Sequence, residues 1–169
     1  NVAEYTLAMV LNLLKDIPLS MALASKCEWR QVKGRQLSSI TYGIVGCGYV
    51  GKALVKLIKA FGCKILINDI KDMSGFCAEN GISQVSLDAL VSQSDVLSVH
   101  LPKNKATEGI ISKELLSKMK SGSYLINSAR GGLVDEAAVR ELLDLEHLAG
   151  AAFDVLNLIA HVPQPKVLV

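Results

Sequence analysis

Apolar positions along the chain alternate between two periods from about residue 41 onward. Short apolar runs, typical of strands, are separated by stretches with the spacing of amphipathic helices. Runs such as 65–67 and 96–99 carry few polar positions, which indicates strands buried on both faces of a parallel sheet. The expected strands lie near residues 41–46, 64–69, 96–100, 123–127 and 150–155, and the expected helices near 49–61, 86–93, 112–119 and 135–145. This order predicts an α/β fold with a doubly wound parallel sheet and right-handed crossovers.

The first 30 residues precede this alternation and predict two helices. Apolar residues recur at helical spacing over 2–17, and Pro18 separates this segment from a second helical stretch over about 19–29. Residues 31–39 are polar and predict a loop. The first helix is rather apolar, so it has two interpretations: a contact with a second subunit or another domain, or packing against its own domain.

Three glycines follow the first expected strand with the spacing G-x-G-x-x-G. Gly46 permits a tight turn, Gly48 leaves room for a pyrophosphate near the backbone, and Gly51 lets the next helix pack closely. Asp69 ends the second strand, where a carboxylate can bind ribose hydroxyls and repel a 2′-phosphate. The pattern predicts dinucleotide binding and favours NAD, while Lys71 leaves NADP open. The alternative is an α/β protein with a glycine-rich turn and an ordinary surface aspartate.

Polar residues also end the remaining expected strands, at 100–102, 127–130 and Asp154. Ligands of doubly wound sheets bind beyond the carboxyl ends of the strands, so these residues are expected at one edge. Arg130 can hold a substrate carboxylate with two hydrogen bonds and polarise an adjacent carbonyl. Its alternative is an ordinary salt bridge. Asp135 is expected to cap a helix without a catalytic role, and Ser86 to cap another.

The three histidines carry no acid–base pattern of their own. His100 ends a strand, where a hydrogen-bonded structural role is favoured over proton transfer, and neither His147 nor His161 has a supporting carboxylate. The four cysteines, Cys27, Cys47, Cys63 and Cys77, form no C-x-x-C pair, so neither a metal site nor a disulfide scaffold is expected. Cys47 and Cys63 are expected to be buried free thiols in a reducing cytosol.

Composition excludes several classes of protein. The formal net charge is +2 without a basic stripe, which argues against nucleic acid as a partner. No apolar run is long enough to span a membrane, and no basic segment precedes an apolar one as in a signal peptide. We therefore expect a cytoplasmic protein that binds neither nucleic acid nor membrane.

The motifs together resemble the D-isomer-specific 2-hydroxyacid dehydrogenases. The matching segments are 46–51, Asp69, 100–102, 127–136 and 149–155, within a resemblance that covers about residues 1–156. The resemblance implies one Rossmann-type NAD-binding domain over 1–169. Within it, 1–30 forms N-terminal helices with a dimer or interdomain contact, 41–155 forms the core, and 156–169 is a divergent or truncated tail.

The resemblance also implies which residues bind the pyrophosphate and ribose of NAD. The backbone N–H groups of Tyr49 and Val50 hold the pyrophosphate, next to Gly46, Gly48 and Gly51. The carboxylate of Asp69 binds the ribose.

A second group of residues is implied at the nicotinamide end of the cofactor. Leu101 and Pro102 line the cofactor, and Ser128 and Ala129 lie beside the nicotinamide. Arg130 is the catalytic arginine that orients the substrate, and it also borders the cofactor. Asp154 contacts the nicotinamide carboxamide, with a strand-end cap as its alternative.

The acid–base pair of the family is not found in the sequence. The resemblance implies a Glu shortly after Asp154, but Asn157 and Ile159 occupy the matching positions, and no Glu follows Glu146. The family's His follows an apolar strand, whereas His161 precedes the corresponding run. Two explanations remain: the residues lie outside this sequence, or the protein has lost the pair.

The resemblance further implies a homodimer acting on a small 2-hydroxy or 2-keto acid. The catalytic, substrate-binding domain of the family is missing from this chain, so we expect the chain alone to bind NAD with little or no turnover. A non-catalytic NAD-sensing module, similar to co-repressor relatives, is the main alternative. A methyltransferase is a third, against which the glycine spacing and the block 127–135 argue.

Overall fold

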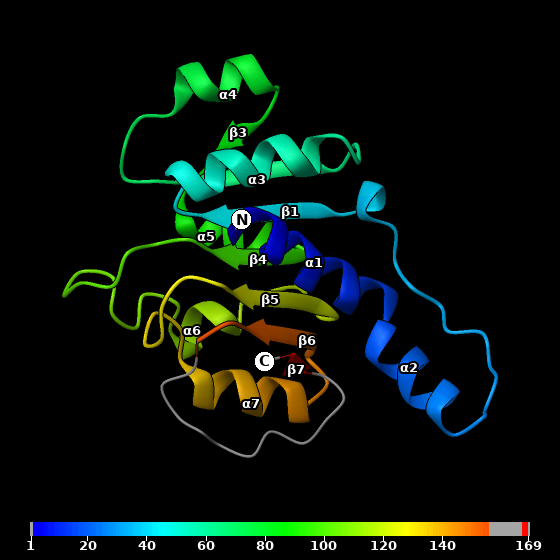
Figure 1. Ribbon diagram of the computed structural model, residues 1–169. Coiled ribbons are helices and arrows are strands. Elements are labelled where there is room, and N and C mark those ends of the chain that lie inside the picture. Colours follow the sequence, from blue (N-terminus) through cyan, green and yellow to red (C-terminus); the bar gives the residue numbers. More distant parts are fainter. Residues whose placement is uncertain (1, 156–166, 169) are drawn as a thin grey trace.

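The computed structural model describes residues 2–155 and 167–168 (Figure 1). Seven parallel strands form one sheet in the order β3-β2-β1-β4-β5-β6-β7. The strands are β1 (Thr41–Val45), β2 (Lys64–Asn68), β3 (Ser83–Gln84), β4 (Val96–Val99), β5 (Ser123–Asn127), β6 (Leu148–Phe153) and β7 (Val167–Leu168). The order reverses between β1 and β4, which confirms the doubly wound sheet and places its switch point after these two strands.

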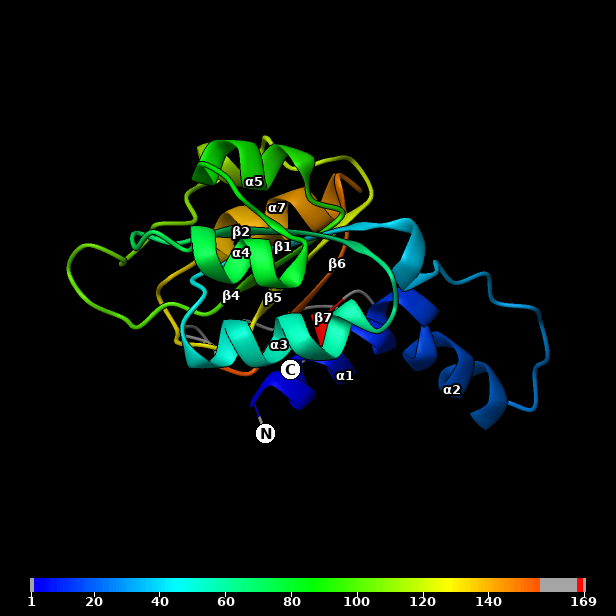
Figure 2. The same ribbon diagram turned by 90° about the horizontal axis from the view of Figure 1, so that it is seen from above.

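Helices cover both faces of the sheet (Figure 2). The longer ones on the first face are α1 (Val2–Lys15) and α3 (Tyr49–Lys59), with α4 (Ser74–Asn80) at the β2 side. The opposite face carries α5 (Leu87–Gln93), α6 (Lys113–Leu116) and α7 (Glu136–Asp144). The remaining two helices, α2 (Ile17–Ser25) and the short 3-10 helix η1 (Leu37–Ser39), lie between α1 and β1 in the chain.

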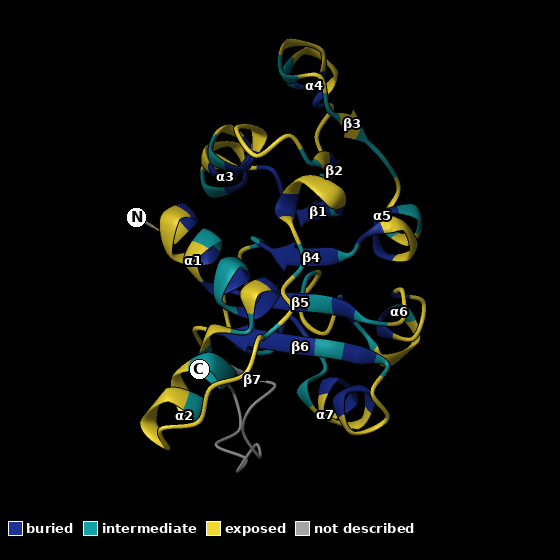
Figure 3. Cartoon of the chain, turned by 90° about the vertical axis from the view of Figure 1, so that its right-hand side faces the viewer, coloured by how far each residue is buried: buried dark blue, intermediate teal, exposed yellow. Residues whose placement is uncertain are grey.

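The strands are buried on both sides, as their apolar runs predict. Ile44 and Ile67 belong to the core beneath α1 and α3, whereas Leu97 and Leu125 belong to the core beneath α5, α6 and α7. All four residues of β4 are buried (Figure 3). The sheet is therefore the rigid layer between two apolar cores, and its strand ends hold the loops that follow them.

Side-chain caps set the start of three helices. Ser86 accepts a hydrogen bond from the N–H of Ala89, and Asp135 accepts one from the N–H of Ala138. Both caps confirm the sequence analysis. Ser112 caps α6 in the same way.

Several boundaries and short elements differ from the expectation. The first helix ends at Lys15 rather than residue 17, because Asp16 adopts a left-handed conformation with φ of 50°. Pro18 lies in the first turn of α2, where its missing N–H costs nothing, so that helix starts earlier than expected and ends at Ser25. The last expected strand, 150–155, begins and ends two residues earlier as β6. The elements α4, β3 and η1 were not predicted, because they are too short to show a period.

The cysteines are only partly as expected. All four are free, and Cys47 and Cys77 are buried, but Cys63 is half-buried and Cys27 is exposed. Cys63 is a free thiol as expected, but the expectation that it is buried was wrong, because the residue precedes β2, where the chain comes in from the surface.

Helix α2 is apolar, yet none of its residues is buried. Met21 is 68% exposed, and Trp29 on the segment that follows is 91% exposed. Among the described residues no single helix has the length and hydropathy to cross a membrane; α1 and α2 pass that test only as a pair bent by 63°. Helix α1 packs on the sheet and on α3, whereas the apolar residues of α2 are at most partly covered by the described part of the chain.

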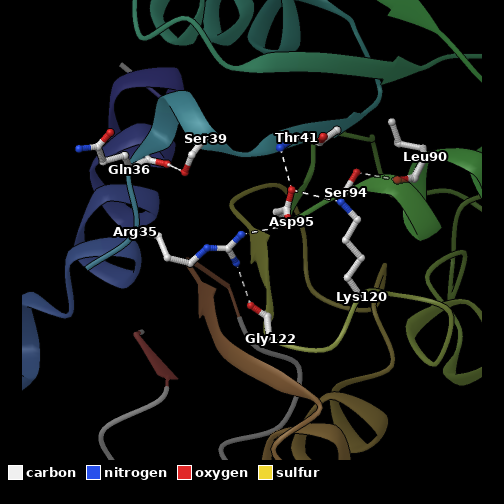
Figure 4. Close-up of polar contacts among 9 residues, drawn as sticks. All are labelled: Arg35, Gln36, Ser39, Thr41, Leu90, Ser94, Asp95, Lys120 and Gly122. Carbon is white, nitrogen blue, oxygen red and sulfur yellow. Dashed lines mark hydrogen bonds and ion pairs between the residues drawn. The ribbon is translucent and has the colours of Figure 1, made fainter. Parts of the chain in front are cut away.

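A cluster of charged groups, the Asp95 cluster, joins the amino ends of three strands (Figure 4). The Asp95 carboxylate accepts hydrogen bonds from the N–H of Thr41 at 2.8 Å, from Arg35 at 3.0 Å and from Lys120 at 3.2 Å. Arg35 also donates to the carbonyl of Gly122 at 3.2 Å. Burial raises the pKa of Asp95, but these hydrogen bonds lower it by more, so the pKa lies below its usual value. The cluster attaches the 31–36 segment to the sheet at the edge opposite the glycine loop.

Candidate functional site

The glycine loop joins β1 to α3 at the switch point of the sheet. Gly46 has a φ of 87°, and a Cβ on it would lie 2.9 Å from the carbonyl oxygen of His100. A Cβ on Gly51 would lie 2.5 Å from the carbonyl oxygen of Gly46. Both positions therefore require glycine for the loop and helix to pack against β1 and β4.

Gly48 differs from the other two glycines because its Cβ position faces open space. Nothing lies within 4 Å of a Cβ built there, and its φ of −73° is ordinary. Gly48 is also the N-cap of α3, whose first turn carries no acidic residue. The positive end of the helix dipole therefore faces open space next to exposed backbone, which suits an anion.

The carboxylate of Asp69 lies beside the same loop. Its Oδ2 accepts the N–H of Cys47 at 2.7 Å, and its Oδ1 accepts the N–H of Lys71 at 2.9 Å. These bonds fix the carboxylate and leave further lone pairs on each oxygen. Asp69 therefore orders the glycine loop as well as presenting an acceptor to a ligand.

A first cavity, the Asp69 cavity, has a volume of about 310 Å³. It is lined by Cys47, Gly48, Tyr49, Lys52, Asp69, Lys71 and Met73. Lys52 also lies over the ring of Phe76, 5.2 Å from its centroid. Burial, and then the charge of Asp69, raise the pKa of the Cys47 thiol to about 11, so this thiol stays protonated and unreactive at neutral pH.

A second cavity, the Ser128 cavity, has a volume of about 530 Å³. It is lined by Val2, Val50, His100, Leu101, Pro102, Lys103, Ser128, Ala129 and Arg130. Residues of α1, of α3 and of the loops after β4 and β5 thus meet around one space. The exposed guanidinium of Arg130 and the amine of Lys103 give this space a positive border.

The turn after β5 is shaped by Asn127, a buried residue of the predicted strand end 127–130 for which no separate role was expected. Its Nδ2 donates to the carbonyl of Arg130 at 3.0 Å, and its Oδ1 accepts the N–H of Ala129 at 3.2 Å. The Arg130 Nη1 donates to the carbonyl of Ala129 at 2.7 Å. An Asn at the end of a strand is the sequence signal for such a side-chain turn.

His100 lies at the inner wall of the Ser128 cavity. Its Nε2 lies 3.0 Å from the Oγ of buried Ser98. Burial lowers the pKa of His100 to about 4, so the imidazole is neutral at physiological pH. This environment agrees with the structural role favoured from the sequence.

The predicted residues gather at one edge of the sheet, and nine of the twelve line the two cavities. Gly46 and Gly51, which shape the glycine loop, are not among the described residues that line either cavity. Gly48, Tyr49 and Asp69 line the Asp69 cavity; Val50, Leu101, Pro102, Ser128, Ala129 and Arg130 line the Ser128 cavity. Asp154 follows β6 at the same edge, with its N–H bonded to the carbonyl of Asn127 at 3.0 Å, but it is not among the described residues that line either cavity.

Positions discussed for the acid–base pair, Asn157, Ile159 and His161, lie outside the described residues. Within 2–155 and 167–168, no three His, Cys, Asp or Glu side chains form a group able to hold a metal ion.

Comparison with known proteins identifies the family. Residues 7–165 match the model of the D-isomer specific 2-hydroxyacid dehydrogenase, NAD binding domain. A D-3-phosphoglycerate dehydrogenase of Bacillus subtilis (strain 168) is 36% identical over 157 residues, which are 92% of this chain and 30% of that protein. A D-specific alpha-keto acid dehydrogenase of Enterococcus faecium is 35% identical over 93% of this chain and 48% of its own length.

The fold is also similar to solved structures. A D-lactate dehydrogenase from Aquifex aeolicus, complexed with NAD and lactic acid, superposes with a TM-score of 0.88 at 36% identity, over 92% of this chain and 47% of that one. The chain thus spans between about a third and a half of the length of these relatives. The open space over Gly48, the bare N-terminus of α3 and the fixed carboxylate of Asp69 fit a dinucleotide. The chain belongs to the D-isomer-specific 2-hydroxyacid dehydrogenase family, whose NAD-binding domain it represents.

Proposed function

We propose that residues 1–169 serve a dehydrogenase that transfers hydride between NAD(H) and a 2-hydroxy or 2-keto acid in the whole protein. The observation that carries this proposal is the position of the two cavities on either side of the glycine loop, at the switch point of the sheet. One cavity contains the fixed carboxylate of Asp69, and the other contains Arg130. A dinucleotide that crosses the loop would reach both.

The Asp69 cavity would hold the adenosine half of the cofactor. Asp69 would accept ribose hydroxyls, and the N–H groups of Tyr49 and Val50 at the start of α3 would hold the pyrophosphate. Gly46, Gly48 and Gly51 would keep this loop close to the ligand. The 2′-phosphate of NADP would be attracted by Lys52 and Lys71 and repelled by Asp69, which all line this cavity.

The Ser128 cavity would hold the nicotinamide half beside the substrate. The bound nicotinamide supplies or accepts the hydride. Leu101, Pro102 and Ala129 would provide an apolar wall that excludes water, and Arg130 would bind the substrate carboxylate and polarise the adjacent carbonyl. Asp154, which follows β6, is proposed to contact the nicotinamide carboxamide.

Turnover needs a second wall that closes the site. Arg130 is exposed, and the Ser128 cavity is partly open to solvent. We therefore propose that the chain alone binds NAD(H) and turns over little. One sequence feature favours the alternative of a non-catalytic NAD-sensing module: Asn157 and Ile159 stand where the resemblance implies a Glu. Reduction of a 2-keto acid by the longer protein would exclude the sensing module.

The test is a calorimetric titration of this chain with NADH and, separately, with NADPH. We expect micromolar binding of NADH, weaker binding of NADPH, and a loss of NADH affinity in Asp69→Ala. The matched control is Asp88→Ala, a carboxylate of α5 that is exposed and lines neither cavity. Absence of NADH binding by the wild-type chain would contradict the proposal.

We further propose that α2 is the contact surface of a homodimer. Ile17 and Met21 are exposed apolar residues of α2 within the described part of the chain. The four free thiols agree with a reducing, cytoplasmic setting. Met21→Glu is expected to convert the dimer to a monomer in light scattering coupled to size exclusion. Leu145 is also 68% exposed but lies at the end of α7, so Leu145→Glu is the control and should leave the dimer intact. A wild-type chain that is monomeric, or a dimer that survives Met21→Glu, would contradict this assignment.

A further inference from the structure

A pair of buried hydroxyl groups connects the first helix to the Ser128 cavity. The Oγ1 of Thr6 lies 2.7 Å from the Oγ of Ser128, although the residues are 122 positions apart in the chain. Thr6 is fully buried and Ser128 is 5% exposed. Helix α1 packs against β5 and β6 on one face of the sheet (Figure 2). The pair therefore forms where the helix layer meets the sheet.

The hydroxyl of Thr6 has a second partner besides Ser128. A hydroxyl group carries one proton, and that of Thr6 is donated to the carbonyl oxygen of Val2 at 2.9 Å. Either hydroxyl of the pair has the geometry of a donor; in the arrangement in which Thr6 donates to Val2, Thr6 accepts the proton of Ser128. With its proton used in this way, the Ser128 oxygen has only lone pairs left for any further partner.

Both ends of this chain of hydrogen bonds border the same cavity. Val2 and Ser128 are lining residues of the Ser128 cavity, whereas Thr6 lies behind them. Thr6 thus fixes the rotation of the Ser128 hydroxyl and holds the first turn of α1 against the turn after β5. It does so without being one of the residues that line the cavity.

We propose that Thr6 is a positioning residue for the nicotinamide end of the cofactor. It makes Ser128 a hydrogen-bond acceptor, matched to an N–H or O–H group of the ligand, and keeps the cavity wall formed by Val2 in place. The inference rests on the proposed binding of NAD(H) to this site. It adds a residue of α1 to the specificity of the site and predicts an effect confined to one half of the dinucleotide.

The experiment compares NADH with ADP-ribose, which lacks the nicotinamide, as ligands of the 169-residue chain. Thr6→Val keeps the shape of the side chain but removes its hydroxyl, so the proton of Ser128 loses its acceptor. We expect NADH to bind about tenfold more weakly, a loss comparable to one buried hydrogen bond, and ADP-ribose to bind as before. Thr6→Ser restores the hydroxyl and should restore the NADH affinity.

Two further variants separate positioning from a general loss of stability. Ser128→Ala should weaken NADH but not ADP-ribose, and adding Thr6→Val to it should cause no further loss, because Thr6 acts through Ser128. Asn12→Ala is the matched control, since it removes another side-chain bond to the backbone of α1, from Asn12 to the carbonyl of Ala8, at an exposed position. It should change neither ligand.

The outcomes are distinguishable. Unchanged NADH affinity in Thr6→Val, equal losses for both ligands, or additive losses in the double variant would each overturn the role of Thr6. If the wild-type chain binds neither ligand, the proposed NAD site itself fails. Wild-type binding of both ligands with no selective effect at Thr6 or Ser128 overturns the inference alone.

Discussion

The open space over Gly48 makes a prediction that separates ligand binding from folding. In Gly48→Ala the added methyl group meets nothing within 4 Å, and the φ of −73° suits alanine. The only expected cost to folding is that alanine is a poorer N-cap than glycine, which is below about 1 kcal/mol. The free energy of unfolding should therefore stay close to that of the wild type.

The same methyl group should interfere with NADH. It would occupy the space in which a pyrophosphate approaches the backbone at the start of α3. Loss of one hydrogen bond to a charged group costs about 1.5–3 kcal/mol, which corresponds to a roughly 10- to 150-fold higher Kd. Gly48→Ala should thus be well folded and deficient in binding.

Gly51→Ala is the matched comparison within the same loop. Its Cβ would lie 2.5 Å from the carbonyl oxygen of Gly46, so the helix or the loop has to move. Such overpacking costs about 1–3 kcal/mol, more than the ~1 kcal/mol that alanine gains in helix propensity. We expect Gly51→Ala to lose both stability and NADH affinity.

Stability is measured by urea unfolding with circular dichroism as the signal. Binding is measured by calorimetric titration with NADH. Binding of NADH by Gly48→Ala as tight as that of the wild type would contradict a pyrophosphate site over Gly48. Equal losses of stability in Gly48→Ala and Gly51→Ala would also contradict it, since the space over Gly48 would then be needed by the protein itself.

The remaining predictions concern the Asp95 cluster and His100. Asp95→Ala should lower the free energy of unfolding by about 2–4 kcal/mol, because the Thr41 N–H loses a charged acceptor, whereas Lys120→Met should cost less than about 1 kcal/mol; equal effects in urea unfolding would contradict this. Because the pKa of Asp95 is lowered in the folded state, its stabilisation is complete above the ordinary carboxyl pKa and is lost as pH falls through the folded-state value. His100 acts at higher pH: with a pKa of about 4 in the folded state against 6.5 unfolded, it should make the unfolding free energy decrease as pH falls from 6.5 toward 4. His100→Gln should flatten that window, and an unchanged slope would show that His100 is not its source.

The parts of the fold that follow local rules could be predicted from the sequence. The glycine loop, the carboxyl ends of β1, β2, β4 and β5, and the Ser86 and Asp135 caps depend on residues that are close in the chain. Apolar runs and turn residues report such features directly. The predicted boundaries of α1 and α2 were less accurate. A proline such as Pro18 is compatible both with the first turn of a helix and with a position just after a helix ends.

Contacts between distant segments could not be predicted in this way. Thr6 meets Ser128 across 122 positions and Arg35 meets Asp95 across 60, and a buried hydroxyl or a surface arginine has no periodic signal of its own. The edge elements α4 and β3 were missed because they are short and depend on other segments: β3 pairs with β2, and α4 contacts β3.

The exposure of Trp29 determines what optical measurements on this protein report. It is the single tryptophan of the chain and is 91% exposed, so its indole is already surrounded by water in the folded protein. Unfolding changes that environment little, and the emission spectrum should barely shift across the unfolding transition. Because Trp29 follows the apolar surface of α2, a shift of the emission to shorter wavelength would instead report that another chain has covered this segment. The same fluorophore is thus a poor probe of folding and a built-in probe of assembly.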